Sequence, residues 1–202
     1  LGCHTGTISD AFLELYQAGK LTNAHKELDT GLSAWNLAMG SQELYDWLEA
    51  EPQLFHPGDL DYIHSVERIS KFSNVISING GVQLDLMGQE NAESTGTRQL
   101  SGVGGQMDFL EGAYRSKGGK GFICINSSRV TKDGERKSNI LATIPGGSTI
   151  SAPRTMIQYV ATEYGIASLS GKTLRERAEA MASIAHPDFR EELMKYAQEN
   201  FK

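Results

Sequence analysis

The sequence predicts an α/β or α+β fold in which helices cover a sheet. Helical patterns occur at both ends of the chain, whereas residues 74–162 alternate short β-rich runs with Gly-rich turns. The 202 residues include 22 Gly but only 5 Pro, and this excess of Gly indicates many tight turns or a backbone that approaches a ligand. Because no repeat or low-complexity linker interrupts the chain, we read it as one domain.

Helix boundaries are marked by local capping signals. Ser9 is expected to cap a first helix that stops near Gly19, and Ser41 to cap a second over residues 42–50. Near the end of the chain, Thr173-x-x-Glu176 and Asp188-x-x-Glu191 are typical of capping boxes. The sequence therefore predicts two closing helices, each with an apolar face for the core.

The middle of the chain carries the strand signals. Strands are expected over residues 74–78, 82–86, 121–126, 140–144 and 156–162. The Asn79-Gly80-Gly81 turn predicts that the first two form a β-hairpin. Two polar segments separate the others, residues 88–105 and residues 127–139.

Composition excludes several classes of function. The formal charge of −6 gives no basic footprint for nucleic acid, and no apolar run approaches the length of a membrane span. Two Cys suit a reducing cytoplasm rather than a disulfide framework. The five scattered His show no zinc spacing, so no metal site is expected, and the absence of GxSxG gives no support for a serine hydrolase.

Two Gly-rich segments have the composition of anion sites. In residues 101–109, Gly102, Val103, Gly104 and Gly105 precede Gln106, and such a backbone can point N–H groups at a ligand oxygen. The alternative is a plain turn between two strands, because the P-loop and GxGxxG patterns are both incomplete. Residues 116–121, which include Lys120, would cradle a phosphate or form a solvated turn before a strand.

Glu163 follows the last predicted strand. A carboxylate at a strand end is well placed for a cleft in α/β architectures. A surface acid at a turn explains the same position equally well.

Five collinear blocks resemble the C-terminal half of the acetyl-CoA hydrolase/transferase family. They are GGVQLDLMGQ (80–89), SGVGGQMDF (101–109), YVATEYGIA (159–167), GKTLRERA (171–178) and IAHPDFR (184–190). The resemblance covers nearly the whole chain and implies a NagB/RpiA/CoA-transferase type of α/β fold with a mixed central sheet. It implies a cytoplasmic, homo-oligomeric enzyme without a cofactor, coenzyme A being a substrate. It also implies that residues 1–202 are the C-terminal catalytic domain of a longer chain, with little turnover of their own.

The resemblance further implies a ping-pong transfer of CoA between an acyl-CoA and a carboxylate through a glutamyl-CoA thioester. Gly104 and Gly105 match the segment that supplies an oxyanion donor, and Glu163 matches a supporting acid. We expect Gly102, Val103, Gln106, His64 and Lys120 to contact the CoA ester.

Two positions depart from the family pattern. In GCHTGTISD (2–10), Gly6 occupies the place of the nucleophilic Glu, and in DYIH (61–64), His64 occupies the place of an Asn. A hydrogen side chain cannot attack a thioester. Three interpretations stay open: a diverged enzyme such as an acyl-CoA hydrolase, a CoA-ester-binding relative without transfer activity, or a sequence-level change in a working transferase.

Overall fold

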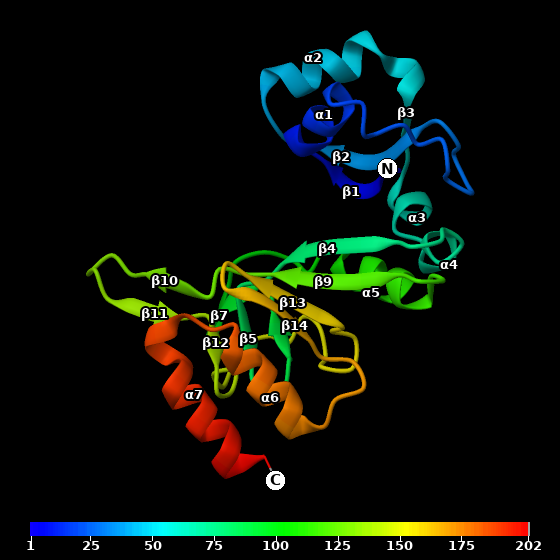
Figure 1. The fold of residues 1–202 in the computed structure, drawn as a ribbon. Coiled ribbons are helices and arrows are strands. Elements are labelled where there is room, and N and C mark those ends of the chain that lie inside the picture. Colours follow the sequence, from blue (N-terminus) through cyan, green and yellow to red (C-terminus); the bar gives the residue numbers. More distant parts are fainter. Residues whose placement is uncertain (202) are drawn as a thin grey trace. The chain divides into compact units, whose positions relative to one another are not determined.

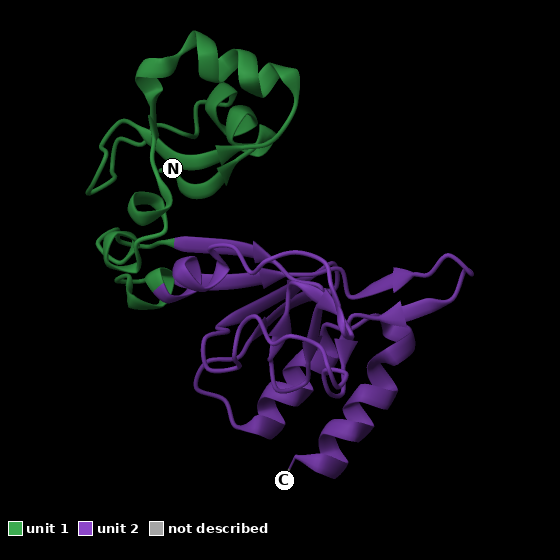
Figure 2. Cartoon of the chain, turned by 180° about the vertical axis from the view of Figure 1, so that it is seen from behind, with its two compact units in different colours: residues 1–75, 112–119 green, residues 76–111, 120–202 purple. Residues whose placement is uncertain are grey.

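The computed structural model describes residues 1–201 and divides the chain into two compact units (Figure 2). The first unit comprises Leu1–Val75 and Gly112–Gly119. The second comprises Ile76–Glu111 and the chain from Lys120 onward. No linker in the sequence marks this division.

The first unit is built on a parallel sheet of order β1-β2-β3, formed by His4–Ile8, Ser33–Ala38 and Phe55–Pro57. Its helical elements are α1 (Asp10–Gln17), α2 (Gln42–Ala50), η1 (Pro52–Leu54), α3 (Leu60–Ile63) and α4 (Val66–Ile69). Apolar side chains from these elements form a core of Cys3, Ile8, Leu13, Leu21, Leu44, Trp47 and Phe55.

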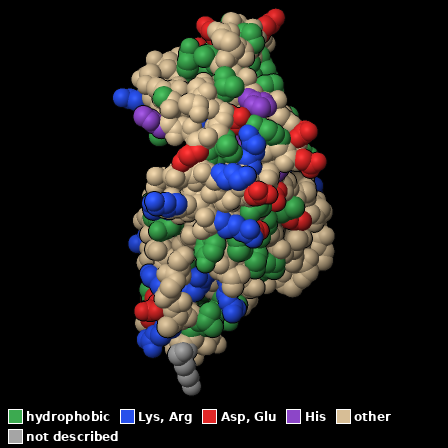
Figure 3. Space-filling view, turned by 90° about the vertical axis from the view of Figure 1, so that its right-hand side faces the viewer, with side chains coloured by type: hydrophobic (Ala, Val, Ile, Leu, Met, Phe, Trp, Pro, Cys, Tyr) green, Lys and Arg blue, Asp and Glu red, His purple; other side chains and the backbone are tan. Residues whose placement is uncertain are grey.

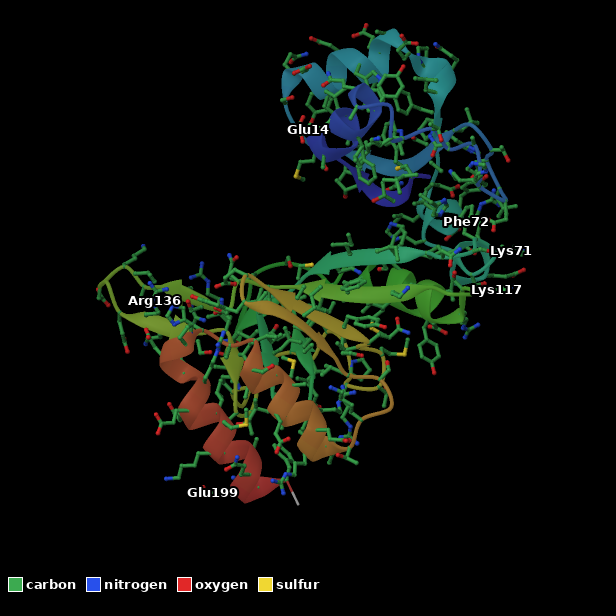
Figure 4. The ribbon with its side chains drawn as sticks, viewed as in Figure 1. Glu14, Lys71, Phe72, Lys117, Arg136 and Glu199 are labelled. Atoms are coloured by element: carbon green, nitrogen blue, oxygen red, sulfur yellow. The ribbon has the colours of Figure 1, made fainter. Side chains whose placement is uncertain are left out.

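The segment Gly112–Gly119 joins this unit although it follows much later in the chain. The Ser116 hydroxyl donates to the Phe72 carbonyl at 2.7 Å, and the Asn74 amide donates to the Lys117 carbonyl at 2.8 Å. Figure 4 shows Lys117 beside Lys71 and Phe72. A Cβ at Gly119 would lie 2.1 Å from the Ala113 carbonyl oxygen. Close backbone packing therefore accounts for a Gly here.

The second unit contains a mixed four-stranded sheet of order β14-β13-β9-β4. The strands are Gly165–Ser168, Tyr159–Thr162, Lys120–Cys124 and Ile76–Gly80, in that order across the sheet. β4, β9 and β13 run parallel, and β14 pairs antiparallel with β13. The α/β class with a mixed sheet is confirmed.

Smaller sheets complete the unit. A three-stranded sheet has the order β12-β5-β6, formed by Ile140–Leu141, Gln83–Asp85 and Glu90–Asn91. Two antiparallel pairs are β7 (Ser94–Thr95) with β8 (Arg98–Gln99), and β10 (Ser128–Val130) with β11 (Arg136–Ser138). The β10–β11 pair forms the polar excursion of residues 127–139 that the sequence predicted.

Helices α5 (Gln106–Arg115), α6 (Leu174–Ser183) and α7 (Pro187–Asn200) complete the fold. Figure 1 shows α6 and α7 side by side below the four-stranded sheet. Buried side chains shared by the sheet and the helices include Leu110, Ile123, Val160, Met181 and Leu193. Apolar burial of this kind supplies the main favourable free energy of folding.

The predicted hairpin over residues 74–86 is wrong. β4 pairs with β9 and β5 pairs with β12 and β6, so the turn between β4 and β5 connects two different sheets. Gln83 and Asp85, which alternate with apolar residues in this predicted strand, are both buried in the central strand of the β12-β5-β6 sheet. Pairing between distant segments decided this region, and a local turn signal cannot report it.

Capping predictions had mixed outcomes. Thr173 and Glu176 form the predicted capping box. The second box is wrong, because His186 is the N-cap of α7 and Pro187 takes the first helical position. Ser9 is the N-cap of α1 but makes no capping bond with its side chain. The sequence did not predict β1, β2, α3, α4 and α5. The strands expected over 140–144 and 156–162 are shorter in the structure, where they are β12 and β13.

Candidate functional site

A pocket of about 410 Å³ opens beyond the carboxyl ends of β4, β9 and β13. Its lining comprises Gly81, Cys124, Ile125, Asn126, Ala161, Thr162 and Glu163. The carboxyl ends of parallel strands meet at one edge of a sheet, where ligands bind in open α/β folds. The topology therefore brings Glu163 to the place where a ligand is expected.

Glu163 is held at this edge by Ser127. The Ser127 amide donates to Oε2 at 2.9 Å, and the Ser127 hydroxyl donates to Oε1 at 2.6 Å. Burial of Glu163 would raise its pKa, but these two hydrogen bonds outweigh burial and lower the pKa below its ordinary value. Glu163 is therefore an ionised carboxylate at neutral pH, with its orientation set by both donors.

The backbone on either side of Glu163 is also fixed. The Ile125 amide donates to the Ala161 carbonyl at 3.0 Å. The Thr162 hydroxyl donates to the Ile184 carbonyl at 2.7 Å and accepts from the Tyr164 amide at 3.1 Å. The acid thus projects from a rigid strand end, which gives it a defined position in the pocket.

The Gly-rich residues 102–105 lie on the surface, where Gly104 has a φ of +60°. The predicted turn between two strands is wrong in one respect, because this segment connects β8 to helix α5. Among the described residues, the pocket lining includes none of Gly102, Val103, Gly104 and Gly105. The pocket and the Gly-rich run are therefore separate features rather than one hollow.

A buried pair connects the two features. Gln106, the first residue of α5, donates through Nε2 to both carboxyl oxygens of Glu90, at 2.7 and 2.8 Å. A Cβ at Gly81, in the pocket wall, would lie 2.8 Å from Glu90 Oε1. Glu90 therefore lies directly behind the wall of the pocket and contacts the helix that follows the Gly-rich run.

Burial raises the pKa of Glu90 to about 7. The Gln106 hydrogen bond acts to lower this pKa, and the charge of Glu93 acts to raise it further.

Sequence reasoning missed both Glu90 and Ser127. Glu90 stands in a polar segment and Ser127 after a strand, so neither carries a local signal of its role. Only the pairing of distant segments places them beside the pocket.

Lys120 is not brought to the pocket. It begins β9, whereas Cys124 at the other end of the same strand lines the pocket. Four residue steps along the strand place these ends roughly 13 Å apart. A phosphate contact from Lys120 would therefore need a ligand that extends well beyond the pocket.

The two departures from the family pattern lie close together in the first unit. Gly6 is in β1, and His64 is the C-cap of α3, which packs against β1. A hydrogen bond of 2.8 Å between His4 Nε2 and the Ile63 carbonyl joins the two elements next to these positions. Gly6 and His64 are therefore carried by neighbouring elements, and their membership of one site stays a prediction.

The described residues form neither a metal-binding cluster nor a helix that could cross a membrane. Residues 1–201 contain no group of three or more His, Cys, Asp or Glu that would hold a metal ion. No described helix combines the length and the apolar character needed to cross a bilayer. Figure 3 shows Lys and Arg side chains interspersed with Asp and Glu side chains over one face.

Comparisons with known proteins agree with this picture. Residues 40–197 match the family described as "Acetyl-CoA hydrolase/transferase C-terminal domain". The chain is 43% identical over 98% of its length to butyryl-CoA:acetate CoA-transferase of Anaerostipes caccae, covering 44% of that protein. It is 44% identical over 100% of its length to 4-hydroxybutyrate coenzyme A transferase of Clostridium kluyveri, covering 46% of it.

Among solved structures, the crystal structure of 4-hydroxybutyrate CoA-transferase from Porphyromonas gingivalis matches with a TM-score of 0.82 and 36% identity. That match covers 100% of this chain and 46% of the other. The chain thus spans less than half the length of the curated relatives that it matches.

Proposed function

Because the chain belongs to the acetyl-CoA hydrolase/transferase family, we propose that it acts on acyl-CoA thioesters and transfers CoA to a short-chain carboxylate. The single observation that carries this proposal is Glu163, an ionised carboxylate fixed by Ser127 in a pocket at the strand ends. An acyl group and a carboxylate of a few carbons fit the volume of about 410 Å³.

Transfer would proceed through covalent intermediates on a Glu carboxylate. The carboxylate oxygen attacks the thioester carbonyl, the C–S bond breaks, and CoA leaves as a thiolate from an acyl-glutamyl anhydride. The thiolate then attacks the glutamyl carbonyl, which releases the first acid and forms a glutamyl-CoA thioester. An incoming carboxylate attacks this thioester, and the returning thiolate takes the new acyl group and regenerates the Glu carboxylate.

The position of the nucleophile is the open element of this scheme. Gly6 offers no side-chain carboxylate at the place where the family resemblance expects one. Glu163 lines the pocket and keeps lone pairs on both oxygens beyond those that accept from Ser127. We therefore propose Glu163 as the carboxylate that meets the thioester in this chain.

Hydrolysis is the second candidate, and the exposure of Glu163 favours it. An ionised carboxylate within reach of a bound thioester can take a proton from water and direct the hydroxide at the carbonyl. The acid and the CoA thiol would then be the products, with no enzyme-bound thioester.

Borohydride trapping separates transfer from hydrolysis. The longer chain that the family resemblance predicts is incubated with butyryl-CoA, treated with borohydride and digested, and the peptide that contains Glu163 is analysed by mass spectrometry. Transfer predicts reduction of Glu163 to the alcohol, which E163Q abolishes. Release of free CoA without a reduced Glu supports hydrolysis and contradicts transfer. Absence of both the reduced Glu and the released CoA would overturn the proposed function. The E191Q variant, at an exposed Glu of α7, serves as a matched control.

Several further points rest on the family resemblance and stay predictions. They are a cytoplasmic location, a homo-oligomeric state, catalysis without a cofactor, and a second domain like the part of the relatives that this chain does not match. The oxyanion role of Gly104 and Gly105 and the CoA contacts of Gly102, Val103, Gln106, His64 and Lys120 are proposals of the same kind.

A further inference from the structure

Glu90 is a buried acid in a polar segment of the chain. Its side chain is completely buried in β6, in the register position opposite Leu84 of β5. Its backbone is also fixed, since the Glu90 amide donates to the Ala152 carbonyl at 3.0 Å and the Ser151 amide donates to the Glu90 carbonyl at 2.8 Å. A buried carboxyl is costly unless it is hydrogen-bonded, and Gln106 supplies the hydrogen bond to both oxygens.

The Glu90 carboxyl and the pocket share one wall. A Cβ at Gly81 would lie 2.8 Å from Glu90 Oε1 and 3.1 Å from Ile123 Cγ2, so the carboxyl packs against the bare backbone of Gly81. Gly81 also lines the pocket together with Glu163. A shift of the Glu90 side chain would therefore be transmitted to the pocket through one residue without a side chain.

The segment around Glu90 also holds both ends of the Gly-rich run. Upstream, the Ser101 amide donates to the Glu93 carbonyl at 3.3 Å. Downstream, Gln106 is bonded to Glu90. Between these anchors, ideal Cβ atoms at Gly102 and Gly104 would find no atom within 4 Å. Packing does not fix the run at these two points, so its position depends on its two ends.

We propose that Glu90 is a positioning residue that, through Gln106, holds residues 102–105 and the first turn of α5 against the Gly81 wall of the pocket. This inference rests on the proposed function, because it assigns the pocket and the run to one acyl-CoA site. The backbone N–H groups of the run would face a developing oxyanion only while the Glu90–Gln106 pair keeps its geometry.

The surroundings make this contact sensitive to protonation. The neighbouring acid Glu93 is bonded to the Ser151 hydroxyl at 2.8 Å and to Gln99 Nε2 at 2.9 Å. The Asp85 carboxylate of β5 accepts hydrogen bonds from the amide and the side chain of Gln89. Helix α5 presents Gln106 to Glu90. Loss of the proton from Glu90 strengthens it as an acceptor for Gln106. The pair should therefore tighten as the pH rises through the pKa of Glu90, which is about 7.

Nuclear magnetic resonance tests the linkage without any substrate. The side-chain amide of Gln106 and the backbone amides of Gly104 and Gly105 are followed between about pH 5 and pH 9 in the full chain. We expect all three to report one shared titration, which disappears in E90Q, where the amide oxygen keeps the acceptor but cannot ionise. Absence of the shared step in the wild type, or its survival in E90Q, overturns the inference.

Kinetics of the longer chain that the family resemblance predicts then test whether the linkage serves the site, because little turnover is expected of residues 1–202 alone. E90L removes the acceptor and should lower kcat by about tenfold or more, as expected when a donor to an oxyanion is misplaced, with a smaller change in KM for the acyl-CoA. E90Q should restore most of kcat and lose the pH dependence near neutrality. Equal kcat for folded wild type and E90L contradicts the proposal. An inactive wild type that still shows the shared titration would instead contradict the proposed function alone.

Discussion

Ser127 donates to both oxygens of Glu163, through its amide at 2.9 Å and its hydroxyl at 2.6 Å. This relationship joins the end of β9 to the end of β13, 36 residues apart in sequence. It turns an acid at a strand end into an oriented, ionised group at the pocket.

Removal of the Ser127 hydroxyl should raise the pKa of Glu163. S127A deletes the side-chain donor that favours the carboxylate, while the amide hydrogen bond stays. The stability that comes from the lowered pKa is present above the pKa of the unfolded chain and is lost as the pH falls through the folded pKa, and S127A should reduce it. Carbon-detected NMR titration of the Glu163 carboxyl measures the change. S128A, whose hydroxyl accepts from Arg136 instead, is the matched control, and an unchanged titration in S127A would contradict the assignment.

Glu90 should make the stability depend on pH in the opposite direction. Its pKa rises from 4.5 to about 7 on folding, so the native state binds more protons than the unfolded state between these values. Stability is therefore greatest below the unfolded pKa and declines as the pH rises to the folded pKa, by a total on the order of 3 kcal/mol. Urea unfolding at a series of pH values should show this decline in the wild type and a flatter profile in E90Q. Parallel profiles for the two proteins would rule out a raised pKa at Glu90.

A carboxylate restored at position 6 tests the departure from the family pattern. Gly6 lies in β1 and is not among the residues with a positive φ, so a side chain there needs no left-handed backbone. If position 6 belongs to the nucleophile, G6E should increase the borohydride-trapped glutamyl adduct by at least about tenfold. The T7E variant alters the next residue of the strand, whose side chain points to the opposite face. Folded G6E with no more adduct than T7E would show that position 6 does not serve the chemistry.

Arg177 should be a major contributor to the stability of the second unit. Its buried guanidinium donates to the carbonyls of Met87, Leu169 and Arg154, each at 2.8 Å. R177A leaves three acceptors without their donor and should lower the free energy of unfolding by about 3 kcal/mol or more. Arg175, on the same helix, makes an exposed ion pair with Glu179, so R175A should cost about 0.5 kcal/mol or less. Similar costs for the two variants in denaturant unfolding would refute this account.

The sequence alone determined the fold class, the family and several helix boundaries. These depend on local or collinear signals: Ser41 caps α2, Thr173 and Glu176 close a capping box, and the family blocks follow one another along the chain. Glu163 was also identified correctly as a strand-end acid, because a strand and its last residue are adjacent in sequence.

Only the tertiary structure decided which segments meet. β4 pairs with β9 rather than with β5, and β9 pairs with β13, so that Gly81, Cys124 and Glu163 meet at one edge. The pairing of β6 with β5 in another sheet places Glu90, which the sequence shows only as one more polar residue, in a buried position behind the pocket wall. Strand pairing and burial are set by contacts between residues far apart in the chain, and no local pattern of polar and apolar residues records them.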